Sequence, residues 1–220
     1  MLRSREVAAE LGNESLTVTT TRGCPQGGVI SPLLWLLVMD DLLGRLGEAG
    51  FDSQAYADDL VIMIGGKFDS TISERTQMAV DLVGDWCQSK GLNLSPNKTT
   101  IVLFTNRRKV NFRPPAVGGT SISVSNETKY LGVILDSKLS LNSHLSYITN
   151  KAIRTFYACK RLFGRKWGLG SKMILWLYKS IIRPMITYAS LIWWPKIGQE
   201  TAKRTLTKVQ RLICLSATGA

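Results

Sequence analysis

The sequence predicts an α+β domain whose sheet is covered by helices, followed by a basic all-helical part. Three observations predict this fold class. Short apolar runs bounded by turn residues alternate with longer amphipathic runs over the first 135 residues. From Leu141 to the end, the apolar spacing is helical, with breaks near Gly164–Gly170 and Pro195–Gly198. The charge also changes sign: residues 1–100 hold 8 Lys+Arg against 13 Asp+Glu, whereas residues 101–220 hold 20 against 3.

Composition restricts the class of protein and its partners. With 220 residues, 45% of them hydrophobic and 20% charged, the chain is not a disordered tail, a collagen-like repeat or a disulfide miniprotein. The net charge of +12 is concentrated after residue 100, and it predicts a polyanionic partner, nucleic acid before membrane. Four scattered cysteines and a single histidine argue against a structural zinc site or a disulfide framework, and favour an intracellular location.

No membrane partner is predicted. The longest apolar stretch, Met173–Trp194, carries Lys179, Arg183 and Pro184 near its middle, so we interpret it as buried helix rather than as a membrane span. The N-terminal residues do not resemble a signal peptide, and they lead into a polar helix pattern.

The elements follow in order. Ser15–Arg22 alternates apolar residues with hydroxyls and predicts a strand, and a loop with three glycines follows at Gly23–Gly28. Ser31 is a good N-cap and Pro32 suits the first turn of a helix, so a helix is expected over the apolar run Leu33–Leu46. The further predicted elements are strands at 53–56 and 60–64, a helix at 71–89, a strand at 99–105, a basic connection at 107–119, and a second hairpin from 122–124 and 129–135.

Asp58 and Asp59 are the main candidates for chemistry. They lie at the bend of an apolar hairpin that lacks the usual Asn-Gly or Asp-Gly turn residues. Only a turn lets two adjacent side chains approach one site, and carboxylates held together need protons or cations to offset their repulsion. Mg²⁺ suits such a pair, because it takes one or two carboxylates plus substrate phosphates. A solvated Asp-Asp turn is the ordinary alternative.

Four ordered segments carry a resemblance to a known family. Tyr56-Ala57-Asp58-Asp59 resembles the Tyr-x-Asp-Asp box of reverse transcriptases, and residues 22–34 are similar to the family's Pro-Gln-Gly loop and Ser-Pro helix. Residues 91–99 and 129–133 resemble the next two boxes, in the family's order. The resemblance is closest to non-LTR (LINE-like) retrotransposon polymerases of insect type, and it covers residues 1–163 well.

The resemblance implies a right-hand polymerase. Residues 1–135 would form a partial palm, without fingers and without the first catalytic strand, and residues 136–220 a helical thumb with the start of a connection region. The implied activity is RNA-directed DNA polymerisation by nucleotidyl transfer with two metal ions, Mg²⁺ with Mn²⁺ as an alternative. The implied partners are an RNA template, a DNA primer, deoxynucleoside triphosphates and the rest of a parent polyprotein (fingers, with endonuclease and RNase H as further candidates). The implied location is the nucleus if the parent element is functional.

The resemblance also assigns roles to residues. Asp58 would bind metal directly and Asp59 would support the same site. Lys98 would protonate the leaving pyrophosphate, although a surface lysine after a turn is an equally good interpretation. The remaining roles are nucleotide and template binding by Gln26, Gly27 and Tyr56, and a primer grip at Tyr130, Leu131 and Gly132.

The expected thumb helix has two faces. At 100° per residue, its apolar positions between Leu141 and Phe163 fall within about 80° of arc. Four cations occupy a similar arc on the opposite side and predict contact with the nucleic-acid backbone: Lys151, Arg154, Arg161 and Arg165. The alternative is a solvated basic face.

Two departures from the family affect the expected activity. No aspartate precedes Asp40, so the third catalytic aspartate of the family is missing, and we expect the 220 residues alone to be inactive. A catalytically dead nucleic-acid-binding fragment of a degenerate element is therefore a second hypothesis. An RNA-dependent RNA polymerase is a third, and the Ala-Asp-Asp sequence and the Pro-Gln-Gly loop argue against it.

Overall fold

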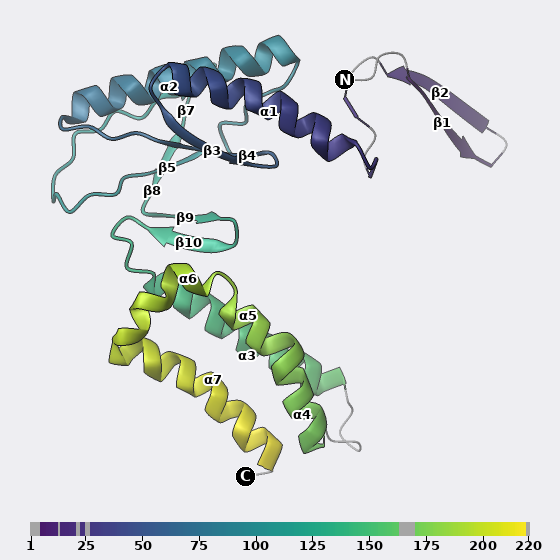
Figure 1. Ribbon diagram of the computed structural model, residues 1–220, viewed down its shortest axis with the longest axis vertical. Coiled ribbons are helices and arrows are strands. Elements are labelled where there is room, and N and C mark those ends of the chain that lie inside the picture. Colours follow the sequence, from purple (N-terminus) through teal and green to yellow (C-terminus); the bar gives the residue numbers. More distant parts are fainter. Residues whose placement is uncertain (1–4, 13, 21–22, 25–26, 163–169, 219–220) are drawn as a thin grey trace. The chain divides into compact units, whose positions relative to one another are not determined.

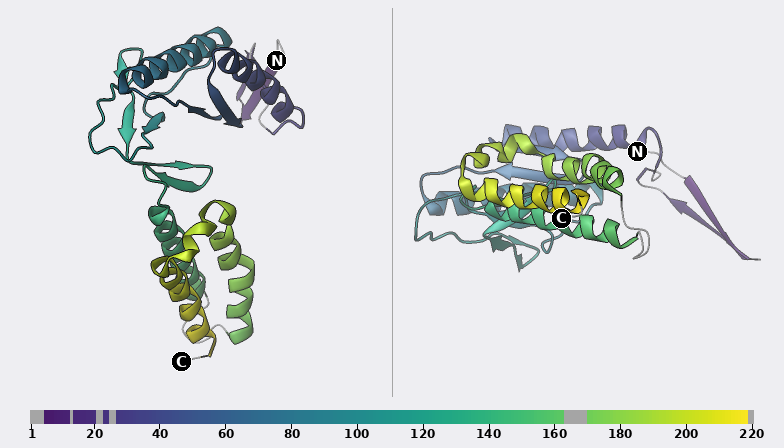
Figure 2. Two further views of the ribbon diagram at one scale, coloured as in Figure 1. Left: turned by 60° about the vertical axis from the view of Figure 1, so that its left-hand side comes forward. Right: turned by 90° about the horizontal axis from the view of Figure 1, so that it is seen from below.

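The computed structural model describes residues 5–12, 14–20, 23–24, 27–162 and 170–218. The chain is mixed helix and sheet, and it forms two compact units (Figure 1 and Figure 2). Unit 1 comprises residues 1–99 and 109–122, and unit 2 comprises residues 100–108 and 123–220. The predicted palm and thumb boundary at residue 135 stays a prediction.

The core of unit 1 lies between two helices and a hairpin. Helices α1 (Ser31–Glu48) and α2 (Asp69–Lys90) pack on the antiparallel hairpin β3 (Asp52–Tyr56) and β4 (Asp59–Met63). The buried residues come from both helices and from the connection after α1: Met39, Leu42, Leu46, Phe51, Ala79, Val83, Trp86 and Cys87. Residues of the hairpin strands, such as Leu60 and Ile62, pack against this cluster. The predicted first hairpin and both helices are confirmed to within two residues.

The start of α1 differs slightly from the prediction. The helix begins at Ser31 itself, and Ile30 is the N-cap without a side-chain cap bond, so the assignment of Ser31 as N-cap is wrong by one position. Pro32 lies in the first turn, as expected, because its missing N–H would find no helical partner there. α2 ends at Gly91, whose φ of +71° lets the chain turn back.

The N-terminal segment is a strand, contrary to the predicted polar helix pattern. β1 (Arg5–Leu11) pairs with β2 (Glu14–Thr20) in an antiparallel hairpin that places Val7 opposite Val18. Ala and Glu favour a helix in isolation, but the cross-strand pairing with a β-prone segment outweighs that preference.

The short hairpin of β6 (Ala116–Val117) and β7 (Thr120–Ser121) is hydrogen-bonded to α2. Gly118 and Gly119 form its turn. The Gln77 side chain donates to the carbonyl of Ala116 (3.0 Å) and accepts from its N–H (2.9 Å). The Gln77 side chain thus bonds both backbone polar groups of Ala116, as a neighbouring strand would.

The small strands of unit 2 pair differently from the prediction. β5 (Thr100–Val102) is shorter than expected and pairs in parallel with β8 (Ser123–Ser125). The second hairpin consists of β9 (Glu127–Tyr130) and β10 (Val133–Asp136), so residues 122–124 are not its first strand. Leu131 and Gly132 form a two-residue turn with φ of +44° and +83°, and this turn sets the register.

The rest of unit 2 is helical. Its elements are α3 (Asn142–Leu162), α4 (Ser171–Leu177), a π-helical turn (Tyr178–Ile182), α5 (Arg183–Thr187), α6 (Ser190–Trp193), a 3₁₀ turn (Trp194–Gly198) and α7 (Glu200–Thr218). α3, α7 and the π-helical turn enclose a core around Phe156, Ile182 and Val209. The stretch 173–194 is therefore not one buried helix but a series of short helical elements. The helical run that starts at Ser171 ends at Thr187, and Ala189, with a φ of +51°, separates it from α6. Among the described residues, no helix is long and apolar enough to cross a membrane.

His144 is buried where α3 meets β10. Its side chain is fully shielded, and Nδ1 accepts a 3.3 Å hydrogen bond from the N–H of Ile134. Nε2 has no hydrogen-bond partner among the described residues. Because burial disfavours the charged ring, the pKa of His144 is lowered from its ordinary value of 6.5.

Candidate functional site

The two candidate aspartates lie at the tip of the β3–β4 hairpin. Tyr56 pairs with Asp59, so Ala57 and Asp58 are the two residues of the turn. Ala57 has a φ of +54°, a conformation that is uncommon for a residue with a side chain. Strained residues of this kind concentrate at functional sites, where the surrounding structure holds them in place.

Trp35 of α1 holds this turn. Its indole Nε1 donates a 2.8 Å hydrogen bond to the carbonyl of Ala57. Trp35 lies in the second turn of the helix that follows the glycine loop, so the loop helix and the carboxylate hairpin are joined directly at the strained residue. Sequence reasoning missed Trp35, because no spacing rule relates residues that are 22 positions apart.

Both carboxylates are open to solvent. Asp58 and Asp59 are exposed, and neither forms an ion pair or a side-chain hydrogen bond with the part of the chain that the structure describes. Adjacent carboxylates without a cationic neighbour attract a cation. Within the described residues there is no group of three or more metal-ligating side chains, so these two would need ligands from a substrate to complete a metal shell.

Asp41, by contrast, is fully engaged. It accepts hydrogen bonds from Trp86 Nε1 (2.9 Å) and Arg45 Nε (3.2 Å), and it pairs with Lys90 Nζ (3.0 Å). The hydrogen bond from Trp86, followed by those from Lys90 and Arg45, lowers the pKa of Asp41 to about 2. This carboxylate links α1 to α2, and it is not available for chemistry.

The glycine loop before α1 leaves room beside its backbone. Gly27 has a φ of +81°, and nothing lies within 4 Å of the place where a side chain would begin. The N–H of Ser31 donates to the carbonyl of Gly28 (3.1 Å), which ties the loop to the helix. Gln26, the other predicted residue of this loop, lies outside the described residues.

Lys98 lies in a tight turn before β5. Its N–H donates to the carbonyl of Ser95 (3.2 Å), and Thr99 closes the same turn. The side chain is exposed and has no ion-pair partner among the described residues. Its role as a proton donor stays a prediction.

The predicted primer grip is the turn of the β9–β10 hairpin in unit 2. Tyr188, which follows α5, donates its hydroxyl to the carbonyl of Leu131 (2.9 Å). A side chain added at Gly132 would begin 3.0 Å from the Tyr188 ring. Sequence reasoning missed Tyr188, because a separation of 57 residues leaves no local signal. The tyrosine fixes the turn, whatever the turn binds.

The basic face of α3 is present as the spacing predicts. Lys151, Arg154 and Arg161 are exposed, whereas the opposite face, with Ala152 and Phe156, is buried. Arg165 lies outside the described residues.

A second basic face on α7 was missed. Arg204, Lys208 and Arg211 are exposed and fall within about 60° of arc, roughly opposite the buried Val209 and Ile213. The same helical arithmetic, applied to residues 200–218, would have found it.

Comparisons with known proteins agree with the motifs. The reverse transcriptase (RNA-dependent DNA polymerase) family model matches residues 6–135. The "Retrovirus-related Pol polyprotein from type-1 retrotransposable element R1" of Bradysia coprophila is 33% identical over 195 residues, which cover 88% of this chain and 19% of that protein. The "RNA-directed DNA polymerase from mobile element jockey" of Drosophila funebris is 27% identical over 178 residues, which cover 76% of this chain and 19% of that protein.

A third relative covers nearly the whole chain. The "Putative 115 kDa protein in type-1 retrotransposable element R1DM" of Drosophila melanogaster is 27% identical over 213 residues, 96% of this chain and 20% of that protein. The chain therefore spans about a fifth of the length of these three relatives. No solved structure matches the chain.

Proposed function

This chain belongs to the reverse transcriptase (RNA-dependent DNA polymerase) family, and from that premise we propose that it supplies palm and thumb parts of a retrotransposon RNA-directed DNA polymerase. Its substrates would be an RNA template, a DNA primer and deoxynucleoside triphosphates. One observation carries the proposal: two exposed, unpaired carboxylates lie at the tip of a hairpin whose strained turn is held by Trp35.

The carboxylates fit a divalent metal of the hard, oxygen-preferring kind. Asp58 and Asp59 would hold Mg²⁺ or Mn²⁺ together with substrate phosphates. When bound, such a metal stabilises negative charge on the attacking and leaving oxygens of nucleotidyl transfer. The part played by this chain is to present two negative charges that no cation of the described residues pairs with, on a turn whose Ala57 carbonyl accepts a hydrogen bond from Trp35.

The other predicted residues would handle the substrates. Lys98 would give a proton to the leaving pyrophosphate. The open backbone at Gly27, with Gln26, and the exposed ring of Tyr56 would face the nucleotide and template. Tyr130, Leu131 and Gly132 would hold the primer end, and the α3 cations Lys151, Arg154 and Arg161 would contact backbone phosphates.

A second candidate is nucleic-acid binding without catalysis. The observation that favours it is that no third carboxylate joins Asp58 and Asp59 among the described residues. The chain spans about a fifth of the length of the three relatives described above, one of which is named as a Pol polyprotein. We therefore propose that activity needs further parts of a parent polyprotein, including fingers, and that the complete enzyme works in the nucleus.

Metal binding and primer extension test the proposal. In the 220-residue chain, Mn²⁺ titration followed by electron paramagnetic resonance should show weak binding that Asp58→Asn removes. Asp85→Asn is the matched control, since it neutralises an exposed aspartate of α2 in the same unit. On a primed RNA template with deoxynucleotides, we expect no extension by the 220 residues alone, and extension by a version lengthened upstream.

In the lengthened version, Asp58→Asn should reduce extension by at least about 1,000-fold, because the carboxylates act as a unit. Extension that is indifferent to Asp58 would contradict the proposal. Extension by the 220 residues alone, lost in Asp58→Asn, would contradict their inactivity and point to a further carboxylate, with Asp40 and Asp52 the first to test.

A further inference from the structure

We propose that a pocket in unit 2, lined by Lys129, Tyr147, Lys151 and Tyr188, seats one phosphodiester group of a nucleic-acid backbone. The inference rests on the proposed function, because it takes nucleic acid as the ligand. It goes beyond that function by assigning one phosphate site to a defined pocket and by adding Tyr147 and Tyr188, which the family motifs do not include.

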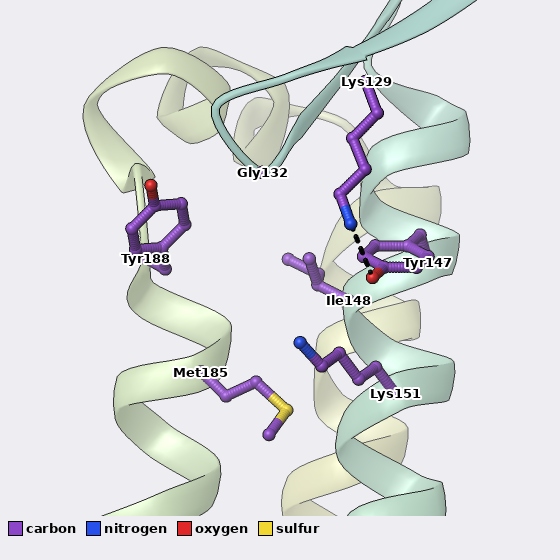
Figure 3. Close-up of a pocket in the computed structure, with 7 residues that line it drawn as sticks. All are labelled: Lys129, Gly132, Tyr147, Ile148, Lys151, Met185 and Tyr188. Carbon is purple, nitrogen blue, oxygen red and sulfur yellow. Dashed lines mark hydrogen bonds between the residues drawn. The ribbon is translucent and has the colours of Figure 1, made fainter. Parts of the chain in front are cut away.

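Three segments build the pocket (Figure 3). Lys129 and Gly132 come from the β9–β10 hairpin, Tyr147 and Lys151 from α3, and Tyr188 from the chain after α5. The remaining lining residues are apolar, Ile148 and Met185. Figure 3 shows the amino groups of both lysines on the same side of the space between α3 and α5.

The pocket is positive and uncompensated. Lys129 Nζ lies 3.2 Å from the hydroxyl of Tyr147 and 5.1 Å from the centre of its ring. The hydrogen bond from Lys129, and then the charges of Lys129 and Lys151, lower the pKa of Tyr147. No acidic residue lines the pocket, and within the described part of the chain neither lysine forms an ion pair. A phosphodiester is already an anion at neutral pH, so the same two cations attract it.

Hydrogen-bonding capacity favours an anion with several acceptor oxygens. Lys129 donates to the Tyr147 oxygen, which leaves the phenolic proton of Tyr147 to donate outward. Each lysine keeps further N–H donors. A phosphate offers several acceptor oxygens to these donors, and the apolar surface of Ile148 and Met185 suits the attached sugar.

The size of the pocket favours a unit of a polymer over a free nucleotide. Its volume is about 250 Å³, below the roughly 300–1,000 Å³ of pockets that enclose whole small molecules. The space admits a phosphate and part of a sugar. A strand that continues outside the pocket fits this size, whereas the pocket cannot enclose a triphosphate together with its base.

Contacts within unit 2 hold the rim of the pocket. Tyr188 donates to the carbonyl of Leu131, and its ring lies against Gly132, so α5 fixes the hairpin turn at the pocket rim. Trp193 Nε1 in turn donates to the carbonyl of Tyr188 (3.0 Å). Preorganisation of this kind lowers the ordering cost of binding.

The test measures binding of the full chain to a labelled RNA–DNA duplex by fluorescence anisotropy across a salt series. Tyr147→Phe removes one hydroxyl and no charge, so affinity should fall about tenfold while the slope of log affinity against log salt stays unchanged. Lys129→Gln and Lys151→Gln should each weaken binding about tenfold and reduce the slope by about one.

Matched controls come from the same helix. Tyr157→Phe removes an exposed hydroxyl ten residues further along α3, and Lys160→Gln removes an exposed charge outside the pocket. Both should bind within about twofold of the wild type.

The outcomes separate the pocket from the proposed function. If Tyr147→Phe and Lys129→Gln bind like the wild type while a double Arg154→Gln, Arg161→Gln variant is weakened, the pocket proposal is wrong and the proposed function stands. If the wild-type chain binds no duplex, the pocket proposal is overturned, and primer extension by the lengthened version still decides the proposed function. Unchanged melting temperatures of the variants ensure that lost binding reports on the pocket and not on unfolding.

Discussion

Unit 1 and unit 2 treat charge in opposite ways. By sequence, unit 1 holds 10 Lys+Arg and 13 Asp+Glu, and unit 2 holds 18 and 3. In unit 1 the cations are the engaged partners: Arg45 and Lys90 pair with Asp41, and Arg75 donates to the carbonyl of Gly50 (2.8 Å). Among the described residues, the aspartates at the β3–β4 tip have no ion-pair partner.

Unit 2 shows the converse pattern. Two of its three acids are engaged, since Asp136 accepts from the backbone N–H groups of Ser140 and Leu141, and Glu200 pairs with Lys203. Among the described residues, the cations of α3 and of the pocket form no ion pair. Each unit thus engages part of its minority charge internally and exposes much of its majority charge, at a cation-attracting hairpin tip in unit 1 and on a polyanion-attracting helix face in unit 2.

The largest expected effect tests this division with equal charge changes in the two units. Replacing Lys151, Arg154 and Arg161 by Gln should lower duplex affinity at least about 100-fold at low salt and reduce the salt slope by about three. The matched variant replaces Arg45, Lys67 and Arg75, three cations of unit 1. Its effect should be several-fold at most. Equal losses in the two triple variants would show that only net charge matters.

An effect of about tenfold is expected from two tryptophans that do the same job in different units. Trp35 donates to the Ala57 carbonyl, and Trp193 donates to the Tyr188 carbonyl. Trp35→Phe should weaken Mn²⁺ binding and leave duplex binding intact, whereas Trp193→Phe should do the reverse. Each lost hydrogen bond should also reduce stability by about 1 kcal/mol. If each variant weakens the binding of Mn²⁺ and of the duplex to the same extent, the two sites are not separately organised.

The smallest effect is a difference in acid sensitivity. His144 in unit 2 has a pKa below 6.5, so the unfolded chain takes up a proton first, and this part of the stability is present above pH 6.5 and is lost as the pH falls below it. Asp41 in unit 1, with its pKa lowered from 3.8 to about 2, contributes stability that is lost only between those values. Hydrogen exchange at pH 7 and pH 5 should therefore show loosening in unit 2 alone.

Two variants check the assignment of these pH effects. His144→Gln should remove the difference in hydrogen exchange between pH 7 and pH 5 in unit 2, since glutamine is not protonated in this range. Asp41→Asn should lower the melting temperature at pH 7, and this difference should narrow as the pH falls from about 4 to about 2. Simultaneous loosening of both units at pH 5 would contradict the assignment.

Local chemistry explains which parts of the fold the sequence predicts. The β3–β4 hairpin, α1, α2 and the two faces of α3 follow from apolar periodicity, turn residues and charge spacing, all of which act within a few residues. The strand at β1 was missed because its Ala and Glu residues favour a helix until β2 pairs with it. The pairing of β8 with β5 was missed because it joins segments more than 20 residues apart.

In the candidate site, too, local features could be predicted and long-range contacts could not. Asp58 and Asp59 could be placed on a turn from the sequence, because the turn is local. Trp35 and Tyr188, which hold the two turns, could not, since each reaches its partner carbonyl across a long stretch of chain. The residues that present chemistry are visible in motifs, whereas the residues that support them emerge only when distant segments fold together.

The hydrogen bond from Tyr188 to Leu131 also has a consequence for the order of synthesis. The two residues are 57 positions apart, so at roughly 5–20 residues per second a ribosome completes the tyrosine about 3–11 seconds after the turn that it secures. During that interval both strands of the β9–β10 hairpin have been synthesised, but Tyr188, which hydrogen-bonds to the turn, has not. A nascent chain therefore completes the support of this turn only late, after most of its helices have been made.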